Sequence, residues 1–195
     1  MISGTGTLLQ ALIDAATDPA FGVEIVAVGS DRAGVEGLAR AEGAGIPTFV
    51  HQLARGADRT GWDCGLTEAV AAHEPDLVIS AGFLKLVGPD FLARFGGRMI
   101  NTHPALLPSF PGIHGPRDAI AYGVKVSGAT VFLVDEGVDT GVILAQESVR
   151  VSDDDTVETL HEKIKVVERA MLLDVTHDLA TRDWRVVDRK VHWLR

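Results

Sequence analysis

An amide and an imidazole stand two positions apart in this chain, at Asn101 and His103. They close a short apolar run that begins at Met99, and residues at this spacing on an extended strand point to the same side. A neutral hydrogen-bond donor beside a titratable donor suits a reaction that builds negative charge on an oxygen atom. Pro104 and Pro108 each fix φ and remove a backbone donor, so they hold the following loop out of helix. We therefore interpret Asn101 and His103 as candidate catalytic residues.

Asp139 is the third candidate, in the acidic segment 135–141. A carboxylate beside an imidazole sets which ring nitrogen carries the proton, so Asp139 is a natural partner for His103. The triplet Asp-Thr-Gly at 139–141 also occurs in aspartic proteases, which need two aspartates that share one proton. This chain has one such triplet, and its alternating strands and helices do not suit an all-β protease. A calcium turn made by Asp135, Glu136 and Asp139 is the other alternative, with too few ligands for a clear metal site.

The composition of the chain limits the classes of protein to which it can belong. With 195 residues and 46% hydrophobic content, positions 1–195 are expected to form a single domain. A net charge of -9 argues against a nucleic-acid partner, which needs a basic face. No apolar stretch reaches membrane-spanning length and the start has no signal-peptide pattern, which predicts a cytoplasmic protein without membrane contact.

Cys64 is the only cysteine of the chain. It cannot form an intramolecular disulfide, and no cysteine cluster is available for zinc. Its expected role is that of a small buried thiol. Five histidines show no metal-ligand spacing and are expected to be structural or exposed: His51, His73, His161, His177 and His192. The sequence therefore predicts no metal site.

Apolar runs alternate with segments of helical periodicity along most of the chain. Helices are expected after the glycine-rich start, over 34–42, over about 62–73, shortly after Pro116 and over a long segment from 157. Strands are expected at 23–28, 47–50, 77–80, 126–134 and 142–151, the last two as a hairpin, and a terminal hairpin at 184–193. Apolar strands that alternate with helices predict an α/β fold with a doubly wound, mostly parallel sheet and helices on both faces.

The long helix from 157 has a recognisable start and a recognisable apolar face. Residues 155–158 have the form of a capping box. The buried face is expected to carry Val157, Leu160, Ile164, Val167 and Met171. Glu168 lies just off this stripe, where a solvated acid is the default interpretation.

The segment 3–8, Ser-Gly-Thr-Gly-Thr-Leu, opens the first helix. Free N–H groups and the positive end of a helix dipole can receive a phosphate there. A glycine-rich turn before a helix is as often only a tight connection. The dinucleotide motif is not complete, because Leu9 stands where its third glycine would be, and there is no P-loop lysine.

Several motifs together resemble the folate-dependent formyltransferases. They are Asn101-x-His103-Pro104, Leu-Leu-Pro-Ser-Phe at 106–110, Gly112, and the aspartate within 135–141. The resemblance implies a Rossmann-like fold and transfer of the formyl group of 10-formyltetrahydrofolate to the amine of phosphoribosylglycinamide in purine synthesis. These two small molecules would be the partners, with no metal, and a homodimer is left open. Asn101 and His103 would stabilise the oxyanion and Asp139 would support His103.

The resemblance also implies contacts with both small molecules. The substrate phosphate would lie at Gly4, Gly6, Thr7 and Leu8, and Glu168 would bind ribose hydroxyls or the amine. Residues around the folate would be Arg59, Phe83, Leu84, Lys85, Leu86, Val87, Asn101, Val134, Asp135, Glu136 and Asp139. Lys85 would pair with the glutamate tail, Arg59 is a second candidate for it, and Thr130 would place a water beside Asp139.

The chain departs from the pattern of this family at four places. Relatives commonly have asparagine at Leu8, arginine at Lys85 and a second histidine at Phe132. They also place a strand before the glycine-rich loop, whereas only Met1 and Ile2 precede Ser3 here, so the first strand is expected to be truncated.

Three other functions are considered. A formyltetrahydrofolate hydrolase would use the same three residues on water, but such hydrolases carry an additional regulatory domain. A tRNA-directed formyltransferase would need a further basic domain. A non-catalytic nucleotide-binding module would keep the glycine loop without needing Asn101, His103 and Asp139.

Overall fold

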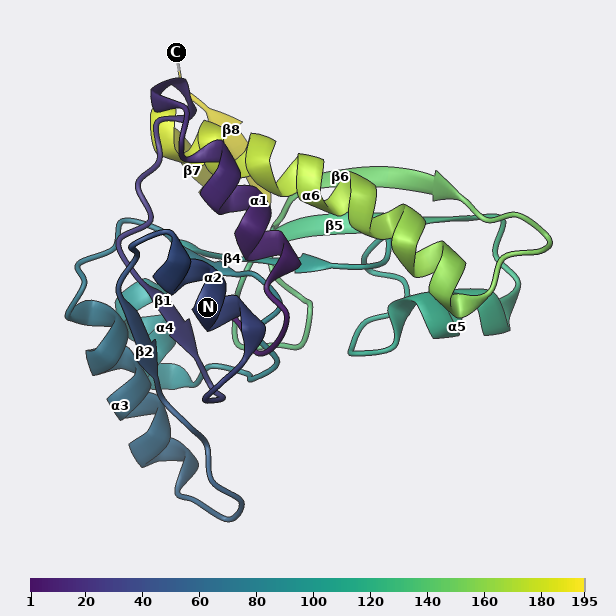
Figure 1. Ribbon diagram of the computed structural model, residues 1–195. Helices are drawn as coiled ribbons and strands as arrows, with labels where there is room; N and C mark the ends of the chain where they lie inside the picture. The colour runs from purple at the N-terminus through teal and green to yellow at the C-terminus, as the bar shows by residue number, and fades with distance from the viewer. Residues whose placement is uncertain (195) are drawn as a thin grey trace. The chain divides into compact units, whose positions relative to one another are not determined.

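The computed structural model describes residues 1–194, and it has the predicted α/β class, with a central, mostly parallel sheet and helices (Figure 1). The chain divides into two compact units, Met1–Ile100 and a second unit that begins at Asn101. The single domain expected from the sequence stays a prediction. Within residues 1–194 no helix has the length and apolar character needed to cross a membrane.

The first unit alternates short strands with helices. Its elements are α1 (Thr7–Ala15), a 3-10 turn (Pro19–Phe21), β1 (Val28–Ser30), α2 (Glu36–Gly43), β2 (Thr48–Val50), α3 (Arg59–Ala71), β3 (Val78–Ser80) and α4 (Pro89–Phe95). β1 and β2 pair in parallel, with Val28 opposite Thr48. The strand expected at 23–28 is wrong in its position, because the backbone pairing begins only at Val28, whose N–H donates to the Pro47 carbonyl.

Residues 1–3 lie in the position expected for the first strand. The Ile2 N–H donates to the Gly29 carbonyl at 2.9 Å, and the Ala81 N–H donates to the Met1 carbonyl at 2.9 Å. The segment therefore bonds to the backbone of β1 on one side and to the end of β3 on the other. Ile2 is 1% exposed, so this short segment anchors the glycine-rich turn that follows it.

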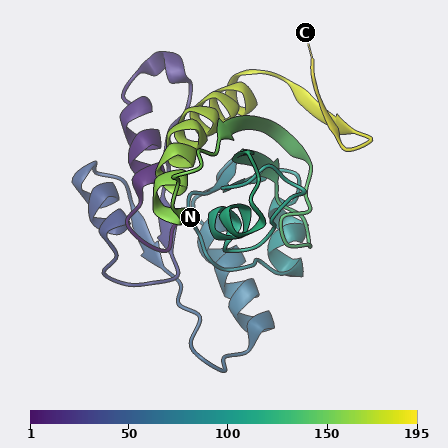
Figure 2. The same ribbon diagram turned by 90° about the vertical axis from the view of Figure 1, so that its right-hand side faces the viewer.

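The second unit contains the longer strands and the longest helix. β4 (Met99–His103) carries the chain into it, followed by α5 (Gly115–Tyr122), β5 (Val126–Leu133), β6 (Ile143–Arg150), α6 (Val157–Thr181), β7 (Trp184–Val187) and β8 (Lys190–Trp193). β5 lies between β4 and β6, and β5 and β6 form the predicted antiparallel hairpin. In Figure 1, α6 runs along this hairpin. The predicted terminal hairpin is β7 and β8, drawn in yellow in Figure 2, where it extends beyond the end of α6.

α6 begins with a capping box, but not between the residues that the pattern indicated. The Thr156 hydroxyl accepts from the Thr159 N–H, and the Thr159 hydroxyl accepts from the Thr156 N–H. The third helical residue, rather than Glu158, completes the box. Leu160, Ile164 and Met171 are buried as predicted, whereas Val157 and Val167 are only partly buried.

The prediction of a buried Cys64 is wrong, because this thiol is exposed. α3 instead buries Trp62, Asp63 and Leu66, and Cys64 lies on another face of the helix. Asp63 accepts the N–H groups of Gly88 at 2.5 Å and of Phe91 at 3.1 Å. The buried carboxylate thus satisfies free N–H groups at the start of α4.

Candidate active site

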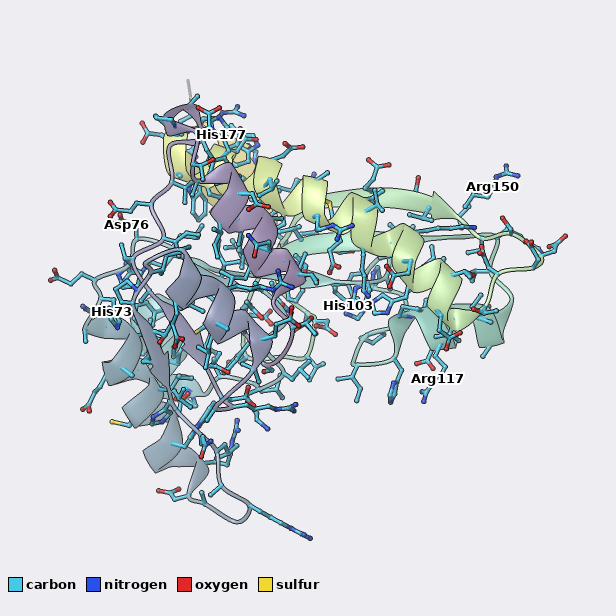
Figure 3. The ribbon with its side chains drawn as sticks, viewed as in Figure 1. His73, Asp76, His103, Arg117, Arg150 and His177 are labelled. Atoms are coloured by element: carbon cyan, nitrogen blue, oxygen red, sulfur yellow. The ribbon has the colours of Figure 1, made fainter. Side chains whose placement is uncertain are left out.

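His103, at the end of β4, is held on both of its ring nitrogens. Its Nε2 lies 2.8 Å from the Phe110 carbonyl oxygen, and its Nδ1 lies 3.5 Å from Asp139 Oδ2. A carbonyl oxygen only accepts, so Nε2 carries a hydrogen. The Asp139 carboxylate lies on the Nδ1 side and brings a negative charge next to the ring. Figure 3 labels His103, which is 3% exposed.

Both partners of His103 have left-handed backbone conformations. Phe110 has φ of 53° and Asp139 has φ of 55°, a region that side-chain-bearing residues rarely occupy. Such a conformation costs on the order of 1–3 kcal/mol and persists only where surrounding contacts enforce it. The two loops are therefore shaped to present an acceptor and a carboxylate to one imidazole.

The acidic turn that carries Asp139 is organised by its own side chains. Asp135 accepts from the Gly137 N–H at 3.1 Å and from the Thr140 hydroxyl at 2.6 Å. A Cβ at Gly141 would lie 1.6 Å from the Leu133 carbonyl oxygen, so only glycine allows the turn to close against β5. The calcium alternative gains no support, because an oxygen of Asp135 is already used within the turn.

Asp139 is joined to the loop after β4 by a backbone contact. Its Oδ2 accepts the Gly112 N–H at 2.6 Å, beside the contact with His103. Asn101, one strand repeat before His103, is partly buried, and in residues 1–194 its carboxamide has no hydrogen-bond partner. The structure therefore brings His103 and Asp139 together and leaves the Asn101 amide available as a donor.

Thr130 is fully engaged with the loop that follows β4. Its hydroxyl donates to the Ala105 carbonyl at 2.7 Å and accepts from the Leu107 N–H at 3.0 Å and from Gln146 Nε2 at 3.0 Å. The residue is fully buried. This geometry supports a role in holding the loop, whereas the water-positioning role stays a prediction without such support.

Glu168 is buried on α6, at 6% exposure, and is not the solvated acid that its position suggested. Burial raises the pKa of this carboxyl group, while a hydrogen bond from Thr102 and the charges of Lys165 and Arg169 act in the opposite direction. Thr102 alternates with Asn101 and His103 along β4, so its side chain points to the other face of the strand. Glu168 thus lies on the side of β4 that carries the Thr102 side chain.

Replacing Glu168 by glutamine is expected to change both the pH dependence of stability and substrate binding. A raised pKa means that folding favours the protonated carboxyl, so the wild type loses stability as pH rises from the unfolded pKa through the folded pKa. Glutamine cannot ionise, so the melting temperature of Glu168→Gln relative to wild type should increase with pH across that window. The resemblance to formyltransferases assigns ribose hydroxyls to Glu168, and on that assignment the KM for the ribosyl substrate should rise, because a neutral amide binds hydroxyls less well than a carboxylate. Thermal melts from pH 4 to 8 and steady-state kinetics would check this; a pH-independent difference would contradict it.

In the first unit, the glycine-rich turn is fitted closely to α2. A Cβ at Gly6 would lie 2.7 Å from the Gly37 Cα, and Gly6 itself has φ of 70°. The Gly4 carbonyl accepts the Gly37 N–H at 3.1 Å, and Arg40 Nε donates to the Thr5 carbonyl at 2.9 Å. α1 then begins at Thr7, without a side-chain cap on its first N–H groups. The start of this helix therefore keeps the donors that an anion needs.

The loop 83–87, which the resemblance places around the folate, has two of its backbone groups already paired. The Leu84 N–H donates to Ser3 Oγ at 2.8 Å, and the Leu86 carbonyl accepts from Arg59 Nη2 at 2.6 Å. The Leu84 and Leu86 side chains are 61% and 59% exposed, while Phe83 is buried. Arg59 is thus placed against the predicted loop, and these contacts fix its shape.

Lys85 faces Asp31, a partner that the sequence did not indicate. Its Nζ lies 3.6 Å from Asp31 Oδ2, and the Asp31 side chain is 1% exposed. In residues 1–194, Oδ1 of Asp31 has no hydrogen-bond partner. Arg32 Nε lies 3.7 Å from the same Asp31 oxygen, so two cations together balance this buried carboxylate in the first unit.

Lys85→Ala is expected to lower the stability of the protein, because it removes one of the two cations beside the buried Asp31 carboxylate and leaves only Arg32. The expected loss in the free energy of unfolding is about 1–3 kcal/mol, with a smaller loss for Lys85→Arg. Urea denaturation would measure it. The double variant Lys85→Ala/Asp31→Asn should recover most of the loss, and no recovery would show that the pair does not carry the effect.

The comparisons with known proteins agree with this geometry. A family model described as formyl transferase matches residues 1–176. The chain belongs to the formyl transferase family. Phosphoribosylglycinamide formyltransferase of Mycobacterium tuberculosis (strain CDC 1551 / Oshkosh) is 56% identical over 189 residues, 97% of this chain and 87% of that protein. The human trifunctional purine biosynthetic protein adenosine-3 is 43% identical over 170 residues, 86% of this chain and 17% of that protein.

One solved structure is similar to this formyl transferase along the whole length of the chain. Glycinamide ribonucleotide transformylase 1 from Symbiobacterium toebii superposes with a TM-score of 0.95, at 39% identity, over 100% of this chain and 92% of that chain. Within residues 1–194 there is no group of three or more side chains suited to hold a metal ion. Whether this formyl transferase works without a metal stays a prediction.

Several groups of the candidate active site gave no signal in the sequence. The Phe110 carbonyl and the Gly112 N–H are backbone groups, and their contribution depends on the path of the loop rather than on a side chain. Gln146 donates to the Leu107 carbonyl at 2.8 Å and so joins Thr130 in holding the same loop. The sequence indicated only that a loop is present here, through its prolines and glycines.

Proposed function

We propose that this chain transfers the formyl group of 10-formyltetrahydrofolate to the amine of phosphoribosylglycinamide, in purine synthesis. Family membership and the 56% identity to a curated phosphoribosylglycinamide formyltransferase support the choice of substrates. The observation that carries the proposal is the placement of His103 between the Phe110 carbonyl and Asp139, two residues after Asn101. Such a set suits a reaction that forms an oxyanion.

In the proposed reaction the substrate amine attacks the formyl carbon and forms a tetrahedral intermediate with a negative oxygen. The Asn101 amide and the His103 Nε2–H both donate to that oxygen. For His103, the oxygen of the intermediate takes the place that the Phe110 carbonyl oxygen has as hydrogen-bond acceptor in the free protein. Each such donor contributes on the order of 3 kcal/mol to stabilising the transition state. Asp139 orients the imidazole and stabilises the positive charge that develops on it in the reaction. The nitrogen of the amine loses one proton and the departing folate nitrogen gains one, so proton balance is kept.

The remaining binding assignments rest on the family and on the local geometry. We assign the phosphate to the N-terminus of α1 at Gly4, Gly6, Thr7 and Leu8, and ribose hydroxyls to Glu168. The folate is assigned to the loop 83–87, Arg59, and the acidic turn at Val134, Asp135 and Glu136. We assign Lys85 to the glutamate tail of the folate. The carboxylates of that tail would compete with Asp31 for the Lys85 ammonium group. We also infer a cytoplasmic location and leave the oligomeric state open.

A formyltetrahydrofolate hydrolase is the alternative that uses the same three residues. Incubation with 10-formyltetrahydrofolate, with and without phosphoribosylglycinamide, separates the two functions. The proposal expects tetrahydrofolate to form only when the amine substrate is present, at a rate that chelator does not change. Formate release without that substrate would identify a hydrolase, and no turnover in either mixture would support a non-catalytic module.

A further inference from the structure

The tip of the C-terminal hairpin reaches the turn that carries Asp139. Arg189 Nη2 donates to the Thr140 carbonyl at 2.7 Å and to the Gly141 carbonyl at 3.1 Å. These are the two residues that directly follow Asp139 in the chain. A charged donor on two successive carbonyl groups makes stronger bonds than a neutral donor would. The contact therefore holds the backbone on the C-terminal side of Asp139.

The acidic turn needs restraint at that point. Asp139 has φ of 55°, which is unfavourable for an aspartate and must be enforced by neighbouring contacts. The bonds made by Asp135 restrain the turn from within, through Gly137 and the Thr140 side chain. Arg189 acts on main-chain carbonyl groups from a separate element, 48 and 49 residues further along the chain.

The hairpin is built so that it can hold a rigid position. Asp188 and Arg189 form its two-residue tip, with φ of 48° and 61°, where glycine or asparagine is usual. At its base the Leu194 N–H donates to the Asp183 carbonyl at 2.8 Å, and the Arg182 guanidinium lies 4.6 Å from the centre of the Trp193 ring. The hairpin is thereby attached to the end of α6. The contact of the Arg189 side chain with the acidic turn explains why an arginine occupies this unfavourable turn position.

We propose that Arg189 is a positioning residue, which keeps Asp139 directed at His103 by fixing the two carbonyl groups after it. This inference rests on the proposed function, because it acts through the role given there to Asp139. It concerns a part of the chain outside the matched family model, which ends at residue 176, whereas the hairpin begins at Trp184. The hairpin is thus a structural support for the catalytic turn.

Arg189→Gly tests the inference with little risk to the hairpin, because glycine suits a left-handed turn position. Asp188→Gly is the matched control, since it changes the neighbouring position of the same turn and leaves the guanidinium in place. We expect kcat to fall about tenfold in Arg189→Gly, with both KM values within about twofold, because a displaced catalytic group loses rate rather than affinity. Asp188→Gly should keep the wild-type kcat, and Arg189→Lys should recover part of the loss.

A double-variant cycle with Asp139→Asn separates positioning from a general structural effect. If Arg189 acts through Asp139, Arg189→Gly should cause little further loss of kcat in the Asp139→Asn background. An equal loss in both backgrounds, an unchanged kcat in Arg189→Gly, or an equal loss in Asp188→Gly would overturn the inference. Should Arg189→Gly fail to fold, Arg189→Gln is scored in the same cycle. Full activity of Asp139→Asn alone would instead refute the proposed mechanism, so the two failures are distinguishable.

Discussion

Asp139→Asn should lower kcat by roughly 10³-fold to 10⁴-fold, the size of effect seen when a buried aspartate that orients a catalytic histidine is replaced. Asparagine keeps the size of the side chain, and its oxygen can still accept the Gly112 N–H. It removes the negative charge 3.5 Å from His103 Nδ1, so positive charge that develops on the imidazole during the reaction loses its stabilising partner. The KM values should change little, because the interaction strengthens as the oxyanion forms. Steady-state kinetics with both substrates measures the effect.

The control for charge removal is Asp154→Asn, at an exposed position of the same unit. It should behave as the wild type. A metal site at the acidic turn would instead give activity that chelator abolishes and a divalent ion restores. A protease would cleave peptides without any folate. Near wild-type activity of Asp139→Asn would remove this carboxylate from the mechanism.

His103→Ala should lower kcat by about 10²-fold to 10⁴-fold, because the imidazole supplies both an oxyanion donor and the proton relay. Folate binding should be largely retained, since the expected folate contacts are made elsewhere. Equilibrium titration with the folate and steady-state kinetics measure the two quantities separately. His192→Ala, at an exposed position of the terminal hairpin, is the matched control and should keep full activity. An unchanged kcat in His103→Ala would exclude it as the catalytic group.

The sequence predicted those parts of the fold and site that depend on local periodicity. Asn101 and His103 share one face because strand residues alternate, and this needs no knowledge of the remaining chain. The hairpin of β5 and β6 was predicted because two apolar runs flank one acidic turn. The terminal hairpin at 184–193 was recognised because its residues alternate about a two-residue turn.

Parts that depend on tertiary contacts were not predicted. Helical spacing placed Glu168 just off the apolar stripe, and only the packing of α6 shows that the carboxyl group is buried. Cys64 was assigned a buried position from its residue type, but the face of α3 that packs inward carries Asp63 instead. The contact of Arg189 with the acidic turn joins segments almost 50 residues apart, and no local pattern indicates it.

The most direct test of the account follows the formyl carbon itself. Folate that carries a ¹³C-labelled formyl group is mixed with phosphoribosylglycinamide and with wild-type protein or Asp139→Asn, and ¹³C NMR records where the label goes. The account predicts that wild-type protein moves the label to an amide on the glycinamide substrate, and that Asp139→Asn leaves it on the folate over the same time. Label recovered as formate, or transferred equally fast by Asp139→Asn, would contradict the account.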